Sequence, residues 1–230
     1  MNDKTNILSG KRQLKTRVKT ARGRKPSSTA WLSRQLNDPY VTLAKKEGYR
    51  SRAAYKLIEI DDKYNLLKPG KTVVDLGCAP GGWVQVAVKR TKSAEQRPQV
   101  VGMDLLEMPS IGGAIIFKHD FTDEDAPMLL KDALSGRSVD VVLSDMAPNT
   151  TGHASTDHLR IMALLEMAVH FSVEVLMPGG AFIGKVFQGG AEREVLDLLK
   201  KHFTTIKHVK PKASRADSSE MYVVATGFRK

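Results

Sequence analysis

Residues 75–83 read Asp-Leu-Gly-Cys-Ala-Pro-Gly-Gly-Trp, and this stretch decides the fold class. Apolar residues at 73–74 precede it and an apolar pattern at 84–88 follows it, which predicts a strand, a glycine-rich turn and a helix. Glycines let a backbone approach a ligand closely, and a helix N-terminus presents free N–H groups. The dinucleotide fingerprint G-x-G-x-x-G is not met, because Ala79 stands where the second glycine should be. The turn therefore favours a nucleoside-type ligand smaller or less anionic than a pyrophosphate, and the alternative is a purely structural turn.

Strand and helix patterns alternate along the rest of the chain. This alternation predicts an α/β fold of the Rossmann-like kind, in which helices cover both faces of a mostly parallel sheet. A direct loop joins the last two strands, which predicts one antiparallel strand in a hairpin at the sheet edge. Besides the strand before the turn, the expected strands lie at 100–104, 115–117, 139–143, 181–187, 203–209 and 221–226, and the expected helices at 53–60, 123–134, 157–176 and 191–202.

The positive charge of the chain is concentrated near its N-terminus. The formal net charge is +11, and residues 1–56 hold 15 of the 36 Lys and Arg residues but 3 of the 25 Asp and Glu residues. We expect residues 1–28 to be a disordered basic arm and residues 29–230 to form a single domain. Such an arm usually binds nucleic acid or an anionic membrane surface, and a solubilising tail is the alternative. Little helical amphipathicity between residues 11 and 25 argues against a membrane-lying helix.

The chain has a single cysteine, Cys78, which excludes an internal disulfide and a zinc site built from several cysteines. No apolar run is long enough to span a membrane, and no apolar segment follows the charged N-terminus as in a secretory signal. The Arg-rich, acid-poor start does have the composition of a mitochondrial transit peptide. We expect no metal site, since His153 and His158 have no third ligand beside them, and no membrane partner.

Several polar residues follow predicted strands, at the edge where parallel strands end and ligands bind. Asp104 ends the second strand and is placed to accept ribose hydroxyls, while Asp120 after the third strand suits an adenine amino group. Asp145 follows the fourth strand, and Lys185 lies within the apolar fifth strand, where a lysine is costly without a partner. A cationic cofactor beside Lys185 would favour its uncharged form, which could act as a base held by Asp145. The alternatives are ordinary polar loop residues and a lysine whose stem covers the sheet edge.

Six motifs between residues 46 and 228 make the chain resemble the FtsJ-like family of ribosomal RNA large-subunit 2′-O-methyltransferases. They are GYRSRAAYKL (48–57), VVDLGCAPGGW (73–83), DLL (104–106), SDMAPN (144–149), PGGAFIGKVFQG (178–189) and SSEMYVVATG (218–227). The resemblance implies a Rossmann-like class I methyltransferase fold with a seven-stranded sheet, and S-adenosyl-L-methionine as cofactor. It also implies a catalytic tetrad and a cofactor-binding set, which are Lys56, Asp145, Lys185 and Glu220, and Gly81, Trp83, Asp104, Asp120 and Asp145.

The reaction that the resemblance implies is methylation of the 2′-hydroxyl of a uridine in the A-loop of 23S rRNA, within the 50S ribosomal subunit. We expect a monomeric, cytoplasmic protein. For contact with RNA phosphates we expect Arg50, Arg52 and the basic loop before the last strand, with Lys210, Lys212 and Arg215. Residues 151–158 depart from the family pattern and could alter the loop over the substrate.

Three other functions stay open from the sequence. A 2′-O-methyltransferase acting on tRNA or on an mRNA cap would share the tetrad. A non-catalytic rRNA-binding assembly factor would need only the fold and a basic surface. A nicotinamide-dependent dehydrogenase would need the intact glycine fingerprint, which Ala79 and Pro80 break.

Overall fold

The computed structural model describes residues 16–20, 22–148, 151–187 and 193–230. The chain divides into two compact units, residues 1–52 and residues 53–230. Asn149, the last residue of the SDMAPN motif, lies outside the described residues.

The described part of the first unit contains the helices α1 (Pro26–Leu36) and α2 (Pro39–Glu47). Both begin with a proline, which is favoured at the first helical position because no N–H is needed there. Asp38 caps α2, since its carboxylate accepts a hydrogen bond from the Tyr40 N–H at 3.0 Å. Helix α1 begins inside the segment that we expect to be disordered, and the division into an arm (1–28) and a domain (29–230) stays a prediction.

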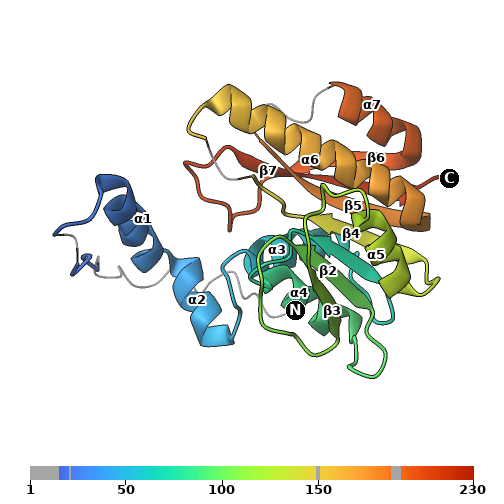
Figure 1. Ribbon diagram of the computed structural model, residues 1–230, viewed down its shortest axis with the longest axis horizontal. Helices are drawn as coiled ribbons and strands as arrows, with labels where there is room; N and C mark the ends of the chain where they lie inside the picture. Colours follow the sequence, from blue (N-terminus) through green and yellow to red (C-terminus); the bar gives the residue numbers. More distant parts are fainter. Residues whose placement is uncertain (1–15, 21, 149–150, 188–192) are drawn as a thin grey trace. The chain divides into compact units, whose positions relative to one another are not determined.

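The second unit is built on a sheet whose strands, in the described residues, follow the order β3-β2-β1-β4-β5-β7-β6. Figure 1 shows this sheet with α6 and α7 lying along β5, β6 and β7. The strands are β1 (Val73–Leu76), β2 (Val100–Asp104), β3 (Ala114–Lys118), β4 (Val139–Ser144), β5 (Leu176–Phe187), β6 (Phe203–Val209) and β7 (Glu220–Phe228). The helices are α3 (Ala54–Tyr64), α4 (Gly82–Thr91), α5 (Ala126–Leu134), α6 (Ala154–Val175) and α7 (Arg193–His202).

The topology confirms the predicted Rossmann-like α/β fold. Strands β1 to β5 pair in parallel, and β7 runs antiparallel to both β5 and β6. The β6–β7 hairpin therefore lies at the sheet edge as expected, with β6 outermost and the antiparallel strand β7 one position inside. The chain proceeds from β1 to β2 and β3 on one side and from β4 to β5 on the other. Because the direction reverses at β1, the crevice beyond β1 and β4 is where this class of sheet binds ligands.

The two faces of the sheet have different roles. One hydrophobic cluster joins α5, α6 and α7 to the sheet, and it includes Phe182 and Val186 of β5 and Val223 of β7. Because side chains alternate along a strand, the residues between these, such as Lys185 and Tyr222, point to the opposite face. That opposite face also holds α3 and α4, which pack against each other. Alternation alone thus directs Lys185 and Tyr222 toward the helix that carries Lys56.

Candidate active site

The glycine-rich turn links β1 to α4 as the sequence predicts. Gly77 has a φ of +77°, and a Cβ there would lie 2.7 Å from the Met146 side chain and 2.9 Å from its backbone. Gly81 has a φ of +106° and is the N-cap residue of α4. Only glycine adopts these conformations without strain, and its small size lets the turn after β1 approach the loop after β4. The backbone at the start of α4 is therefore presented at the switch point of the sheet.

Asp104 is bound to this turn at the end of β2. Its Oδ2 accepts the Ala79 N–H at 2.8 Å, and its Oδ1 accepts the Leu106 N–H at 2.7 Å. A carboxylate oxygen has two acceptor positions, so each oxygen can accept one further hydrogen bond. Asp104 is thus fixed next to the turn, with capacity left to accept hydrogen bonds from ribose hydroxyls, the role that the sequence predicts for it.

Asp120 orders the loop after β3. Its Oδ1 accepts both the N–H and the hydroxyl of Thr122, at 2.9 Å and 2.7 Å. These bonds, the backbone one first, lower the pKa of Asp120, so the carboxylate is ionised at neutral pH. The structure gives no direct contact between Asp120 and the tetrad side chains within the described ranges, and its assignment to a cofactor stays a prediction.

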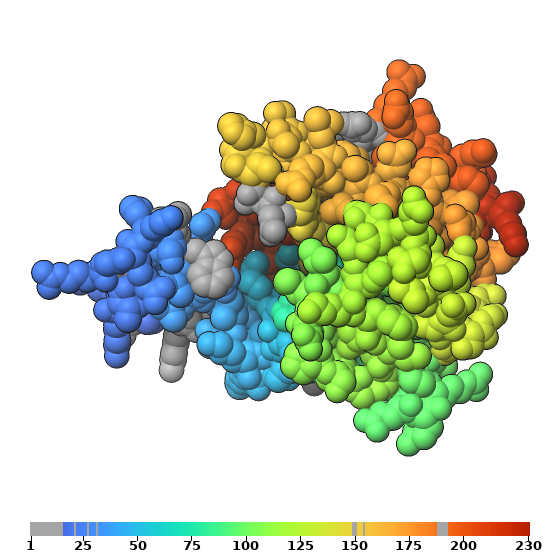
Figure 2. All heavy atoms as spheres, in the orientation of Figure 1, coloured from blue at the N-terminus to red at the C-terminus, as the bar shows by residue number. Residues whose placement is uncertain are grey.

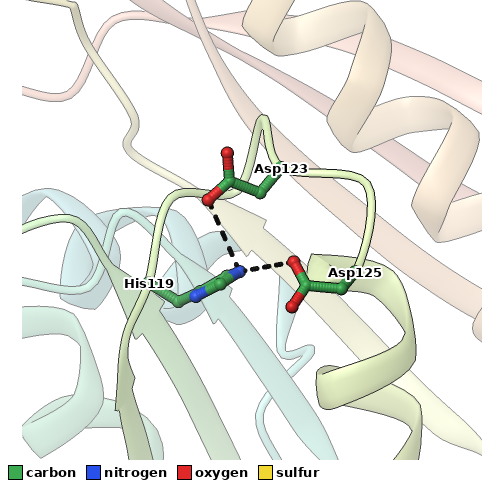
Figure 3. A group of neighbouring side chains, drawn as sticks. All are labelled: His119, Asp123 and Asp125. Carbon is green, nitrogen blue, oxygen red and sulfur yellow. Dashed lines mark hydrogen bonds and ion pairs between the residues drawn. The ribbon is translucent and has the colours of Figure 1, made fainter.

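The neighbouring side chains His119, Asp123 and Asp125 form the cluster drawn in Figure 3. His119 Nε2 lies 2.8 Å from Asp125 Oδ1 and 3.7 Å from Asp123 Oδ2. Three such atoms could ligate a cation. Both carboxylates are more than half exposed, at 57% and 52%, and a histidine–aspartate pair accounts for the arrangement.

Trp83 joins two parts of the site through its buried ring. The indole N–H donates to the Ala53 carbonyl at 2.8 Å, just before α3. The ring packs against Tyr222, with 5.5 Å between ring centroids. The ring is enclosed by protein, so Trp83 would contact a cofactor through its backbone N–H, which lies in the first turn of α4.

Asp145 and Lys185 meet at the carboxyl ends of β4 and β5. Lys185 Nζ lies 2.9 Å from Asp145 Oδ1 and donates to the Asp145 backbone carbonyl at 2.7 Å. Burial alone would raise the pKa of Asp145, but the positive charges of Lys185 and Lys56 and the Tyr222 hydroxyl outweigh it and lower the pKa. Asp145 is therefore a carboxylate at neutral pH, and it holds Lys185 in one orientation. The predicted pairing of these two residues is present.

Lys56 and Glu220 form the other half of the network. Lys56 Nζ lies 2.7 Å from Glu220 Oε1, and both side chains are largely buried. Glu220 Oε1 also accepts the Ser214 hydroxyl at 2.9 Å. The four residues of the expected tetrad are thus brought together from α3, β5, β7 and the end of β4. In Figure 2 a hollow opens between the start of α6, drawn in gold, and the green loops that follow β2 and β3.

Tyr222 connects the two halves, and sequence reasoning did not identify it. Its hydroxyl donates to Asp145 Oδ1 at 2.7 Å and accepts from Lys56 Nζ at 3.2 Å. Burial, followed by the charges of Asp145 and Glu220, raises the pKa of Tyr222 well above its usual value, so the hydroxyl keeps its proton. In the antiparallel ladder Tyr222 stands directly opposite Lys185. The available signal was its position two residues after Glu220, which puts both side chains on one face of a strand.

Replacing Tyr222 by phenylalanine is expected to slow the methyl transfer that the resemblance implies by about tenfold while leaving cofactor affinity unchanged, because a buried hydrogen bond to a charged group contributes about 1.5 kcal/mol or more. The change removes one hydroxyl that orients both Asp145 and Lys56 and keeps the aromatic ring. The measurement is single-turnover transfer, together with calorimetric titration of the cofactor. Tyr64→Phe at the end of α3 is the matched control. An unchanged rate in Tyr222→Phe would show that the hydroxyl has no part in orienting the network.

A further acid, Asp75, lies at the end of β1 with its carboxylate fully buried. Neither of its oxygens has a hydrogen-bond partner within the ranges that the structure describes. Burial first, and then the nearby charges of Asp145 and Asp104, raise the pKa of Asp75 well above its usual value. Burial therefore favours the protonated form of Asp75, and a ligand that brings positive charge to the glycine turn would favour its ionised form instead. S-adenosylmethionine, with its sulfonium and ammonium groups, is such a ligand.

Asp75→Asn is expected to raise the melting temperature of the cofactor-free protein at neutral pH by about 2–4 °C, the shift that about 1 kcal/mol gives at this chain length. A carboxyl whose pKa is raised on folding contributes stability below its unfolded pKa and loses that contribution as pH rises through the folded pKa. The difference between the variant and the wild type, measured by scanning calorimetry, should therefore grow as pH rises from the unfolded pKa of the carboxyl, about 3.9, toward its higher folded value. A difference that does not change with pH would contradict a raised pKa for Asp75 in the folded protein.

The predicted RNA-contacting residues fall into two groups. Arg50 and Arg52 belong to the first unit, where Arg52 Nε pairs with Asp38 at 2.8 Å. The second group lies in the loop between β6 and β7, which contains Lys210, Lys212 and Arg215. Lys210 folds back onto this loop and donates to the carbonyls of Ala216 and Ser218. Among the helices in the described parts of the chain, none is long and apolar enough to cross a lipid bilayer.

Comparison with known proteins connects this geometry to one family. The sequence profile of the FtsJ-like methyltransferase family matches residues 49–228. Two proteins named ribosomal RNA large subunit methyltransferase E are similar over almost the whole chain. The protein from Parvibaculum lavamentivorans is 63% identical, over 96% of this chain and 89% of its own length. The protein from Paramagnetospirillum magneticum is 60% identical, over 96% of this chain and 91% of its own length.

A solved structure supports the same relationship. The crystal structure of a Plasmodium falciparum protein that is named as a ribosomal RNA methyltransferase superposes with a TM-score of 0.68 at 33% identity. The match covers 78% of this chain and 98% of that protein. The family profile, which matches residues 49–228, spans the glycine turn, Lys56, Asp145, Lys185 and Glu220. The chain therefore belongs to the FtsJ-like methyltransferase family.

Proposed function

We propose that this protein transfers a methyl group from S-adenosylmethionine to the 2′-hydroxyl of a uridine in the A-loop of 23S rRNA, on the 50S subunit. As a member of a methyltransferase family whose cofactor is S-adenosylmethionine, the chain is an rRNA methyltransferase. The observation that carries the proposal is the network of Lys56, Asp145, Lys185, Glu220 and Tyr222. In this network two lysines are held by two acids and one tyrosine at the ligand-binding edge of the sheet.

S-adenosylmethionine, when bound, supplies an electrophilic methyl group on a sulfonium sulfur. The residues that would hold it are those at the switch point, namely Gly81 and the start of α4, Asp104 and Asp120. Asp75 adds a buried carboxyl next to them, whose ionised form a cationic ligand would favour. The remaining requirement is to orient the ribose hydroxyl and to handle its proton.

In our proposal Lys185 is the group next to the reacting hydroxyl. Its Nζ accepts or steers the proton of the 2′-hydroxyl, and the Asp145 carboxylate and carbonyl fix where Nζ lies. Lys56 positions the ribose, and Glu220 and Tyr222 hold Lys56. Such a rigid arrangement lowers the barrier chiefly by keeping the reacting groups in the productive geometry.

The substrate assignment rests on the relatives and on charge. Both relatives described above are named as methyltransferases of large-subunit ribosomal RNA. The net charge of +11 suits an RNA partner, because lysine and arginine contacts to phosphates supply affinity without reading sequence. We propose that the partner is 23S rRNA within the assembled 50S subunit, and that the protein acts on it as a monomer in the cytoplasm.

The deciding experiment measures transfer of a tritiated methyl group to three substrates in parallel. These are 50S subunits from cells that lack the enzyme, free 23S rRNA and tRNA. Labelling of 50S subunits, mapped to a ribose in the A-loop, is the expected result. Labelling of tRNA alone would overturn the substrate assignment, and cofactor binding without transfer to any RNA would point to a non-catalytic assembly factor.

A further inference from the structure

The loop between β6 and β7, residues 210–219, is attached to α3 by Glu59. Glu59 accepts two backbone hydrogen bonds from this loop, from the Lys212 N–H at 2.5 Å and from the Ala213 N–H at 3.0 Å. The two contacts use different oxygens of the same carboxylate. At these contacts the loop is packed against the protein, since Ala213 is fully buried and Ser214 is buried too. The contact joins residues that are 153 positions apart in the chain.

The same loop is also connected to the candidate catalytic network. The Ser214 hydroxyl donates to Glu220 Oε1 at 2.9 Å, and Glu220 in turn pairs with Lys56. Lys56 and Glu59 stand three residues apart on α3, a spacing that puts both on one side of the helix. Helix α3 therefore holds the ribose-positioning lysine and the backbone of the basic loop at once.

The charges of the loop suit a phosphate backbone. Lys210 and Lys212 are exposed, and no acidic residue occurs in the sequence from 198 to 216. Lys210 is oriented by its bonds to two loop carbonyls. Lys212 carries its positive charge on the same residue whose backbone N–H donates to Glu59. The position of this positive charge relative to Lys56 thus depends on Glu59.

We propose that Glu59 is a positioning residue for RNA binding. By fixing the backbone at Lys212 and Ala213, it holds the basic loop at a set distance from Lys56 and Lys185. The loop then meets the RNA phosphates that flank the target ribose without first having to be ordered. This inference rests on the proposed function for the identity of the RNA.

The physical basis is the cost of ordering a loop at the moment of binding. Hydrogen bonds from backbone N–H groups to a carboxylate are stronger than neutral ones, and here one carboxylate makes two of them. Without them the loop samples more conformations, and RNA binding has to overcome the lost entropy. Removal of Glu59 should therefore weaken RNA binding more than it lowers the rate of methyl transfer within the bound complex.

The test uses Glu59→Gln in the full-length protein, with Asp62→Asn as the matched control. Glutamine keeps the size of the side chain but offers a single acceptor oxygen. Asp62 is an exposed acid on the same helix, paired with Arg90. Hydrogen–deuterium exchange of the 210–219 peptide, measured without RNA, reports whether the loop is loosened. Steady-state kinetics with 50S subunits then separate KM from kcat.

In Glu59→Gln we expect faster exchange of the amide groups at 212 and 213 and a KM for 50S subunits raised about five- to tenfold, as the loss of a charge-assisted hydrogen bond implies. The kcat should change by less than about twofold, and the control should match the wild type in both measurements. Lys212→Ala should weaken binding in the wild-type background and add little in Glu59→Gln, because both changes act on the same contact.

Unchanged exchange at 212 and 213, or faster exchange with an unchanged KM, would overturn the positioning role. Fully additive effects of Glu59→Gln and Lys212→Ala would overturn it as well. If the wild type does not methylate 50S subunits, the proposed function fails. The same comparison, made with dissociation constants for 23S rRNA, then still decides the role of Glu59.

Discussion

We expect Lys185→Met to lower the rate of methyl transfer by about 10²- to 10⁴-fold, the range for removal of a group that handles a proton. Methionine keeps the apolar stem within β5 and removes the Nζ that lies 2.9 Å from Asp145. The affinity for S-adenosylmethionine should change little, because the glycine turn and Asp104 are untouched. The measurements are single-turnover transfer to 50S subunits and calorimetric titration of the cofactor.

A stability measurement must accompany this prediction. Breaking a largely buried ion pair costs about 3 kcal/mol or more, so the variant should melt at a lower temperature than the wild type. Lys71→Met is the matched control. Lys71 pairs with Asp140 at 2.6 Å near the amino ends of β1 and β4, away from the carboxyl ends that form the site. The control should keep full activity. Normal turnover in Lys185→Met would remove Lys185 from the mechanism.

We expect Asp145→Asn to lower the rate of methyl transfer by about 10²-fold, because the group that orients the proton-transfer residue loses its charge. The asparagine keeps the shape of the side chain, and Lys185 keeps its bond to the residue 145 carbonyl. The variant loses the carboxylate that holds both Lys185 and the Tyr222 hydroxyl. The loss should therefore be smaller than in Lys185→Met, where Nζ itself is absent.

The pH dependence of stability gives an independent check on Asp145. Its pKa is lowered in the folded protein, because the two lysines and Tyr222 outweigh the effect of burial. Such a carboxyl contributes stability above its unfolded pKa and loses it as pH falls through the folded value. The difference in melting temperature between the wild type and Asp145→Asn should be constant near neutral pH and shrink in acid. A difference that grows on acidification would contradict the assignment of Asp145 as a paired carboxylate.

The sequence was informative about the site where local patterns carry the information. Asp104 and Asp145 could be placed because each follows a predicted parallel strand, and such strands end at one edge of the sheet. Lys185 was notable because a lysine within an apolar strand needs a partner. The roles of Lys56 and Glu220, by contrast, came from the resemblance to a family. Without it, their charges would have been taken as surface charges.

The roles of Tyr222, Asp75 and Glu59 could not be predicted from local sequence patterns. Tyr222 matters because β7 pairs antiparallel with β5 in a register that sets it opposite Lys185. Asp75 looks like an ordinary strand residue in the sequence, and only packing reveals a carboxylate buried beside two other acids. Glu59 is one of several acids on α3, and only the return of the chain after β6 brings the loop amides to it.

By itself the sequence determined the alternating α/β fold, the glycine turn in place of a dinucleotide fingerprint, and the concentration of positive charge toward the N-terminus. These are encoded by neighbours in the chain, through the periodicity of apolar residues and the conformational freedom of glycine. The tertiary structure alone decided how the expected tetrad of Lys56, Asp145, Lys185 and Glu220 is connected, through the hydroxyl of Tyr222. Strand order and register are set by packing between distant segments, and no local pattern specifies them.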